Sequence, residues 1–173
     1  MKKSIIFAAC IAIGICAFVT SSRAQRHAAN CTGSQLKLGE AESDADMGGK
    51  RYQRYMFINI SKRRCTLKGF PTVAALSRSG RRLKLSVAYS EDYPGGEGEK
   101  YRPRAVTLAP GGRANFQVYY SDGMALDHPK ITKIAKLRVM ATADKKVFTV
   151  EAGFGACCGS ITVGSIHEGG PGE

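Results

Sequence analysis

The sequence lacks the motifs that most often mark a catalytic site. It has no G-x-S-x-G, no H-E-x-x-H and no phosphate-binding P-loop, which argues against an α/β-hydrolase elbow, a zincin centre and a nucleotide-binding loop. It also has no C-x-x-C, so neither a thioredoxin-like dithiol nor the usual zinc-ligand spacing is present. His27, His128 and His167 stand apart from one another. We therefore predict no metal site, no cofactor and no enzymatic activity.

Long apolar runs occur only at the N-terminus. Lys2 and Lys3 precede an uncharged run over residues 5–19, and Ser22 and Ala24 are small residues at the −3 and −1 positions of a cleavage site. This pattern predicts a cleavable secretory signal over residues 1–24. The run is shorter than the ~20 residues of a spanning helix, so we expect no membrane anchor after cleavage. The remaining 173 − 24 = 149 residues suffice for one domain, and we expect it to be periplasmic or secreted.

Acidic residues are scarce. The chain has 26 Lys and Arg against 14 Asp and Glu, a net charge of +12. Removal of Lys2, Lys3 and Arg23 would leave 12 − 3 = +9. A basic exported protein is drawn to anionic lipid headgroups, cell-wall polymers or nucleic acid, although net charge alone identifies no partner.

Four cysteines remain after the signal, and export makes disulfides the expected state. A Cys31–Cys65 bond would close a loop of 35 residues and contribute roughly 4 kcal/mol by the chain-entropy estimate. Cys157 and Cys158 are adjacent, with a Cα separation of ~3.8 Å across one peptide, below the usual disulfide range. On a strand their side chains would point to opposite faces. We predict the Cys31–Cys65 bond and leave the second pair open, as a vicinal disulfide or as one buried and one exposed thiol.

Short alternating segments dominate the rest of the chain. Apolar and polar residues alternate over 83–89 and 114–120, and Pro110-Gly111 suits a type II turn. Residues 52–60 have apolar side chains on both faces after Tyr55, so we expect a strand that is buried on both sides near its end. We expect a loop over the acidic residues 39–49, a hairpin at Ser79-Gly80, and a segment over 131–141 that begins as a helical turn and ends as a strand. Eight or nine short strands without a long amphipathic helix predict an all-β, antiparallel, immunoglobulin-like β-sandwich. The single domain would cover residues 25–166, followed by a disordered tail over 167–173.

Two segments carry a family resemblance. C-T-L-K-G-F-P at residues 65–71 and L-A-P-G-G-R-A at 108–114 follow F-I-N at 57–59. In this order they resemble the exported bacterial domain-of-unknown-function family 4232, from about Cys31 to Ile166. The resemblance implies a secreted β-sandwich in which Cys31 matches an early cysteine and Cys65 the one before Thr-Leu. It brings no catalytic residues. Many members have a further cysteine near residues 127–129, which this chain lacks, so the resemblance does not settle the second bridge.

Basic residues recur on several of the expected strands and turns. They would form an anion-binding surface if their strands share a sheet, with Tyr89, Tyr119 or Tyr120 nearby to add aromatic contacts. Alternatively, they mark solvent-facing positions and protect strand edges. The candidate anion-binding residues are Lys62, Arg63, Arg64, Arg81, Arg82, Lys84, Lys133, Lys136 and Arg138.

Two functional hypotheses follow. The first is an exported, non-catalytic domain that binds an anionic envelope component or another protein; export argues against nucleic acid as the partner. The second is a thiol-dependent enzyme or redox protein that uses Cys157 or Cys158.

Overall fold

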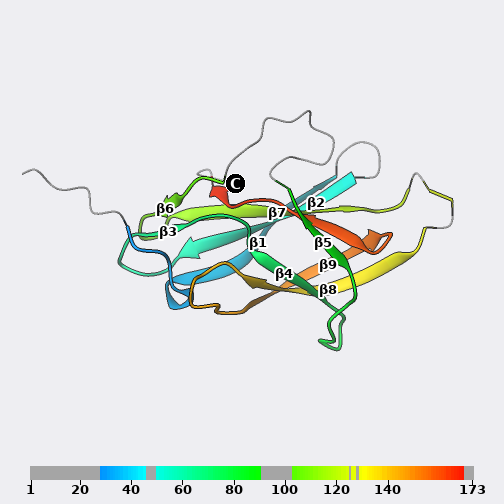
Figure 1. Ribbon diagram of the computed structural model, residues 1–173, viewed down its shortest axis with the longest axis horizontal. Coiled ribbons are helices and arrows are strands. Elements are labelled where there is room, and N and C mark those ends of the chain that lie inside the picture. Colours follow the sequence, from blue (N-terminus) through cyan, green and yellow to red (C-terminus); the bar gives the residue numbers. More distant parts are fainter. Residues whose placement is uncertain (1–27, 46–49, 91–102, 125, 128, 170–173) are drawn as a thin grey trace, which may run out of the picture.

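The computed structural model describes residues 28–45, 50–90, 103–124, 126–127 and 129–169. The predicted signal over residues 1–24 and the last four residues lie outside these ranges. Within them the chain forms one short 3-10 helix, η1 (Gly33–Gln35), and eleven strands (Figure 1). The strands are β1 (Leu36–Ala45), β2 (Lys50–Asn59), β3 (Cys65–Leu67), β4 (Thr72–Leu76), β5 (Ser86–Tyr89), β6 (Val106–Leu108), β7 (Arg113–Ser121), β8 (Ile131–Met140), β9 (Phe148–Cys157), β10 (Ser160–Val163) and β11 (His167–Glu168). No helix among the described residues is long and apolar enough to cross a membrane.

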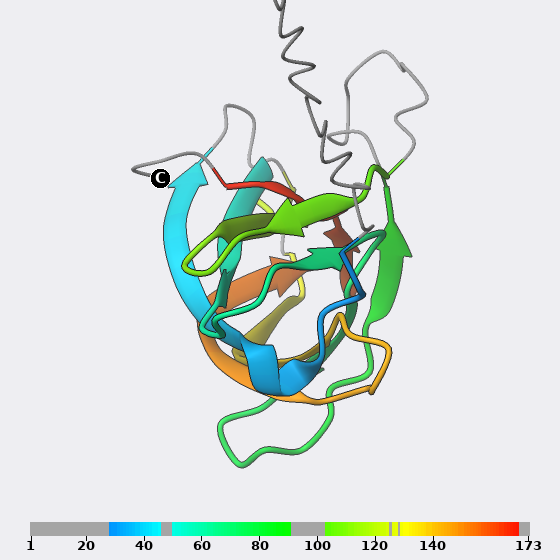
Figure 2. The ribbon, with the colours of Figure 1, turned by 90° about the vertical axis from the view of Figure 1, so that its left-hand side faces the viewer.

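The strands form a sandwich of two main sheets. The large sheet has the order β1-β2-β7-β10-β5, with β11 also paired to β7, and the small sheet has the order β4-β8-β9. Strands β3 and β6 form a separate pair. Figure 1 shows β7 of the large sheet in the upper layer and β4 and β8 of the small sheet in the lower layer, and Figure 2 shows the same molecule turned by 90°. The predicted all-β sandwich is confirmed, and its sheets are mainly antiparallel. One pair of strands, β5 with β10, is parallel.

The core fills the space between the two sheets. Along β2 every second side chain is buried, and Tyr55 and Phe57 are fully enclosed. Phe57 contacts Phe116 of β7, with ring centroids 5.7 Å apart, and Phe148 of β9, at 5.6 Å. Leu137 of β8 is also fully buried. Strand β2 therefore buries one face, as an antiparallel sandwich requires, and the expectation that it is buried on both sides near its end is wrong, because Met56 and Ile58 lie on the outer face and are only half-buried.

The predicted disulfide between Cys31 and Cys65 is present. Both cysteines are buried, and their Cα atoms are 4.8 Å apart. Main-chain bonds flank the bridge, because the Cys31 N–H donates to the Thr66 carbonyl and the Thr66 N–H donates to the Ala29 carbonyl, each at 2.9 Å. The bridge thus holds the N-terminal segment of the domain against β3.

Several expected segments differ in the structure. The acidic segment expected as a loop forms strand up to Ala45, because it is the edge strand β1 and pairs with β2, with a register irregularity between Glu40 and Ser43. Charged side chains are common on edge strands, where they discourage pairing with another chain, so an acidic segment can still be strand. Residues 131–140 are strand throughout, because β9 pairs with β8 from Ile131 onward and β4 pairs with its second half, residues 136–140.

The expected hairpin at Ser79-Gly80 is realised only in part. Arg82 forms a bridge with Leu76, and the Leu83 N–H donates to the Ala75 carbonyl at 2.9 Å. The chain then leaves the small sheet and enters the large one as β5. In this connecting segment Leu83 and Leu85 pack against the core. The segment that crosses between the two sheets therefore also buries apolar side chains.

The sheet also extends beyond the expected end of the domain at residue 166. His167 and Glu168 pair with Asn115 and Ala114 of β7. The Gly169 N–H then donates to the Arg113 carbonyl at 3.0 Å. The first residues expected in a disordered tail are therefore strand, because β7 offers them an unoccupied edge.

Candidate functional sites

Four predicted anion-binding residues lie on the outer face of the small sheet, and a fifth, Lys84, lies in the segment that leaves it. The register pairs Leu76 with both Lys136 and Arg82, and Ala74 with Arg138. Residues directly opposite in antiparallel strands share a face, so Arg82 and Lys136 point to the same side as Arg138. Lys133 is exposed on β8 beside the buried Ile134. Lys84 is exposed in the connection to β5, between Leu83 and Leu85, which pack against the core. We call this surface the basic face; it consists of Arg82, Lys84, Lys133, Lys136 and Arg138.

One carboxylate accompanies these cations. Glu151 of β9 is opposite Lys136 in the register, and its Oε1 lies 3.1 Å from the Lys136 Nζ. Both side chains are substantially exposed, at 70% and 39%, so this ion pair is solvated and contributes little to stability. The basic face therefore retains a net positive charge.

The other predicted cations lie elsewhere. Arg81 belongs to the turn that precedes the bridge at Arg82. Lys62, Arg63 and Arg64 form the turn between β2 and β3, where they line an open groove of 760 Å³ together with Thr32, Gln35 and neighbouring residues. Eight of the nine candidates are thus divided between two surfaces and Arg81 lies in a turn, because the turn between β2 and β3 is not part of the small sheet.

The tyrosines expected beside the cations lie in the large sheet instead. Tyr89 is on β5 and packs edge-on against Phe70, and Tyr120 of β7 stacks on Phe154 with ring centroids 4.2 Å apart. Tyr119 contacts Tyr52 on β2. The expected combination of cations with these tyrosines on one surface is therefore not formed at the basic face.

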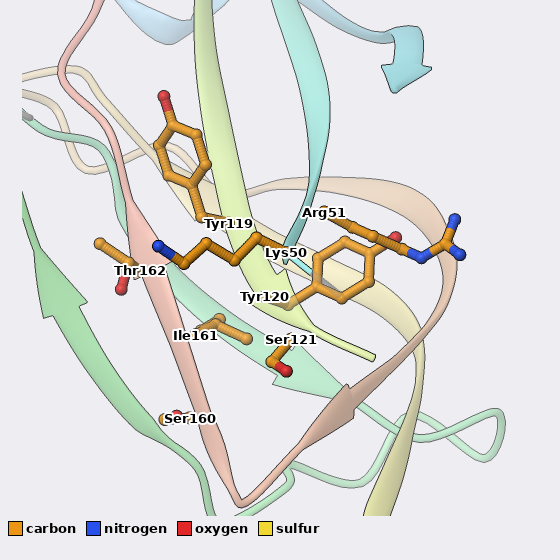
Figure 3. A pocket seen from close by; sticks show the side chains of 8 residues that line it. All are labelled: Lys50, Arg51, Tyr119, Tyr120, Ser121, Ser160, Ile161 and Thr162. Carbon is orange, nitrogen blue, oxygen red and sulfur yellow. The ribbon is translucent and has the colours of Figure 1, made fainter. Parts of the chain in front are cut away.

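A pocket that the sequence did not reveal lies where β7 and β10 separate (Figure 3). Its volume is 180 Å³. The β10–β7 register ends with Thr162 opposite Tyr119, and one further step would have paired Ile161 with Tyr120. The strands diverge there instead. The pocket is lined by Lys50, Arg51, Tyr119, Tyr120, Ser121, Ser160, Ile161 and Thr162; we call it the strand-gap pocket.

Charges at this pocket are partly paired. The Arg51 Nε lies 2.6 Å from the Asp122 Oδ2. The pKa of Asp122 is lowered, first by the main-chain N–H of Met124 and then by the Arg51 side chain. Burial raises the pKa of both Tyr119 and Tyr120, so both phenols remain protonated at neutral pH. The tyrosines therefore offer neutral ring surfaces to the pocket.

The second cysteine pair forms a vicinal disulfide at a crossing between the sheets. Strand β9 ends at the buried Cys157, which is bonded to the exposed Cys158. Cys158 and Gly159 have φ values of 63° and 70°, a combination typical of type I′ turns. The two cysteines are therefore not successive strand residues, which removes the premise that their side chains point to opposite faces.

Hydrogen bonds from both layers hold this crossing. The Cys158 N–H donates to the Lys130 carbonyl at 3.1 Å, and the Gly159 carbonyl accepts the Ser86 N–H at 2.8 Å. Strand β10 begins at the next residue, so it enters the large sheet from the opposite layer. Because β10 enters the large sheet by this route, it pairs with β7 only from Thr162 onward. The strand-gap pocket lies before the first paired residue of β10.

No cluster of three or more histidine, cysteine or acidic side chains is found in the part of the chain that the structure describes. His27 and His128 lie outside it. His167 is in β11, and burial lowers its pKa. The arrangement therefore offers binding surfaces and a disulfide rather than a set of ligands around one point.

Comparison with known families gives one match. The model of a family described as "Domain of unknown function (DUF4232)" matches residues 31–167. No curated protein and no solved structure matches the chain.

Proposed function

The chain belongs to this family of unknown function, DUF4232, and we propose that it is an exported, non-catalytic domain whose basic face binds phosphate groups of anionic envelope lipids. The observation that carries the proposal is the set of five cations on or directly beside one outer sheet face, where Glu151 is the facing carboxylate that the described residues supply. Four of the five are exposed and Lys136 is partly exposed, so a planar lipid surface can reach them.

The energetics favour a charged surface over a single small anion. Each Lys or Arg near an anionic membrane contributes about 1 kcal/mol, and the attraction decays within a Debye length of about 10 Å at moderate salt. No one cation needs a fixed geometry for this effect. Several cations on one face therefore act together on a lipid surface, whereas each would bind one free phosphate weakly.

Vesicle co-sedimentation tests the proposal. The protein should sediment with vesicles of phosphatidylglycerol and phosphatidylcholine, remain in solution with phosphatidylcholine alone, and bind less as salt rises. A Lys84→Gln/Arg138→Gln variant should bind about 30-fold more weakly, since two contributions of about 1 kcal/mol are removed.

A variant with the same change in net charge serves as the control. Lys62→Gln/Arg63→Gln removes two cations from the groove beside β3 and should retain most of the affinity. Equal losses in both variants would show that only the total charge matters and would contradict a specific basic face. Failure of the unsubstituted protein to bind phosphatidylglycerol vesicles at low salt would contradict lipid binding altogether.

A second candidate function is supported by the vicinal disulfide. Its Cys158 is exposed at the turn, and an exposed disulfide is open to thiol exchange. The thiolate of a dithiol reductant would attack the Cys158 Sγ, and Cys157 would leave as a thiolate. The second thiol of the reductant would then release Cys158. Two electrons would pass to the protein, and the reductant would become a disulfide.

Stepwise reduction followed by alkylation and mass spectrometry tests this candidate. At low dithiothreitol, alkylation should appear at Cys157 and Cys158 while Cys31 and Cys65 remain bonded, and the far-ultraviolet circular dichroism should not change. Simultaneous reduction of both bridges, or reduction only after unfolding, would exclude exchange at the folded protein.

A further inference from the structure

We infer that the connection between β7 and β8 inserts apolar side chains into the lipid surface that the basic face binds. These side chains are Met124, Leu126 and Ile131, which we call the apolar tip. The inference rests on the proposed lipid binding and adds a second, uncharged contact to it. Figure 1 shows the described parts of this connection at the right-hand end of the molecule, next to the start of β8.

The side chains of the apolar tip are exposed although they are large. The exposed fractions are 78% for Met124, 53% for Leu126 and 41% for Ile131. In the described part of the chain six large apolar residues are exposed, and three of the six fall within positions 124–131. Scattered single residues of this kind are ordinary on soluble proteins, whereas neighbouring ones mark a contact with a partner or a membrane.

The fold of the connection brings these residues together. The Leu126 N–H donates to the Gly123 carbonyl at 2.9 Å, which closes a turn that has Met124 at its first central position. Gly123 also lies directly over Pro129, since a Cβ built at Gly123 would be 2.6 Å from the Pro129 Cβ. The turn is therefore packed against the segment that leads into Ile131.

The apolar tip continues the basic face. Ile131 and Lys133 are both exposed and lie two residues apart on β8, so their side chains point to the same side. The register places Ile131 opposite Cys157, and residues directly opposite share a face. A Cβ built at Gly123 would lie 3.3 Å from the Cys157 Sγ. The turn that contains Met124 thus lies against the same outer face as the cations.

Apolar residues beside cations favour a lipid surface as the partner. At a membrane interface, apolar side chains enter the boundary of the acyl chains while Lys and Arg remain at the headgroup phosphates. Ile131 and Lys133 offer both kinds of contact from one strand face. A second copy of the chain suits this surface less well, because a symmetric contact would bring the two basic faces together.

The acidic side chains of the connection oppose this contact only weakly. The Asp122 Oδ2 lies 2.6 Å from the Arg51 Nε, so this carboxylate is already paired with a cation. Asp127 and Lys130 are both exposed, and their charges offset each other. The cations of the basic face therefore still dominate the charge that a membrane would meet at this end.

Apolar insertion and charge attraction respond differently to salt. Screening shortens the Debye length from about 10 Å at 0.1 M to about 3 Å at 1 M ionic strength, whereas the hydrophobic effect does not depend on charge. Binding to anionic vesicles should therefore fall with salt to a residual level that the apolar tip sustains.

Tryptophan fluorescence tests the insertion directly. The chain has no tryptophan, so Met124→Trp introduces a single reporter at the tip. With vesicles of phosphatidylglycerol and phosphatidylcholine, its emission should shift to shorter wavelengths and be quenched by lipids brominated on their acyl chains. Ile60→Trp is the matched control, since Ile60 is 61% exposed and follows the far end of β2; its emission should not change.

A pair of variants tests the energetic contribution. Met124→Gln/Leu126→Gln should weaken sedimentation with these vesicles at high salt at least tenfold, which corresponds to about 1.4 kcal/mol, and should retain most of the binding at low salt. Ile60→Gln/Val147→Gln removes two exposed apolar side chains elsewhere and should bind as the unsubstituted protein does at both salt concentrations.

The outcomes separate this inference from the lipid binding on which it rests. Sedimentation of Met124→Trp without a shift or quenching of its emission would overturn insertion and leave binding by the basic face intact. Equal quenching in Met124→Trp and Ile60→Trp would also overturn it, since no single end of the molecule would then enter the bilayer. Failure of the unsubstituted protein to sediment at low salt would overturn both proposals.

Discussion

At the scale of single residues, Asn59 has a structural role that its residue type alone does not reveal. It is fully buried at the end of β2. Its Nδ2 donates to the carbonyls of Arg63, Leu108 and Ala109 at 2.8, 3.1 and 3.1 Å, and its Oδ1 accepts the Ser61 N–H at 3.0 Å. One side chain thus connects the turn after β2 with the end of β6.

Replacing Asn59 should be costly. Asn59→Ala would leave buried carbonyl groups without their donor, and we expect the free energy of unfolding to fall by about 2–3 kcal/mol. Urea denaturation measures the change. Asn30→Ala, at an exposed position, should stay within about 0.5 kcal/mol. Similar values for the two variants would mean that water replaces the lost bonds at Asn59.

Gly159 is required for its backbone conformation rather than for space. Its φ is +70°, and a Cβ built there would meet nothing within 4 Å. Gly159→Ala should therefore destabilise the protein by about 1 kcal/mol through strain in the left-handed region. Gly39→Ala is the matched control, since it also has open space but no positive φ, and it should be neutral or slightly stabilising. Thermal unfolding of both variants compares the two. A neutral Gly159→Ala would show that the turn relaxes.

At the scale of elements, the sequence predicts the strands that bury one face. Residues 114–120 alternate between polar and apolar and became β7. Residues 52–60 were expected as a strand from their apolar content and became β2, but the apolar residues on both faces did not reveal which single face is buried. The edge strand β1 carries small and acidic residues and gives no such signal. The start of β8 was also missed, because a register shift between Ile134 and Lys136 interrupts its alternation.

The positions of the candidate sites depend on the register between paired strands, which cannot be read from the sequence. The basic residues could be named, but only pairing places Arg82 and Lys136 on either side of Leu76 and puts Lys62 elsewhere. The strand-gap pocket had no sequence signal. Lys50 and Ser160 lie far apart in the chain, and they line the same cavity because β7 pairs with β2 on one side and separates from β10 on the other.

The turn between β8 and β9 is fixed to the N-terminal segment by Asp144. The Asp144 Oδ2 accepts the Gly33 N–H at 2.8 Å, and its Oδ1 accepts the Thr142 hydroxyl and the Lys146 N–H. The Thr142 hydroxyl is the first cause that lowers the pKa of Asp144, followed by the Gly33 N–H. A residue larger than glycine would not fit at position 33, where a Cβ would lie 2.2 Å from the Lys146 Cβ.

This lowered pKa predicts a pH-dependent contribution to stability. The folded protein holds the Asp144 carboxylate more strongly than the unfolded chain does, so its contribution is complete above the ordinary pKa of 3.8 and is lost as pH falls through the lower folded value. Asp144→Asn should therefore be less stable than the unsubstituted protein at pH 7, with a difference that shrinks below pH 3.8.

Urea denaturation at a series of pH values measures that difference. Glu168→Gln removes the same charge at an exposed position and should show a smaller difference at pH 7. A difference between Asp144→Asn and the unsubstituted protein that stays constant down to pH 2 would contradict a role for the ionised carboxylate.

At the scale of the whole molecule, the two disulfides lie in different parts of the sandwich. Cys31–Cys65 links residues 34 apart and joins the N-terminal segment to β3, whereas Cys157–Cys158 links neighbours at the crossing from β9 to β10. Loop-closure entropy grows with the number of residues enclosed. The first bridge therefore constrains the unfolded chain strongly, and the second constrains it very little.

Removing each bridge separately should reveal this contrast. Cys31→Ala/Cys65→Ala should lower the free energy of unfolding by about 4 kcal/mol, because the unfolded chain gains the freedom of a long loop. Cys157→Ala/Cys158→Asn should lower it by only about 1 kcal/mol, chiefly from lost packing of the buried Cys157. Asn at 158 tolerates the positive φ of this turn and precedes Gly159, a pair that type I′ turns favour. Urea denaturation of both variants gives the comparison. A loss of about 4 kcal/mol in the second variant would mean that the vicinal bond stabilises the sandwich through native contacts at the crossing, and that its reduction could not leave the fold intact.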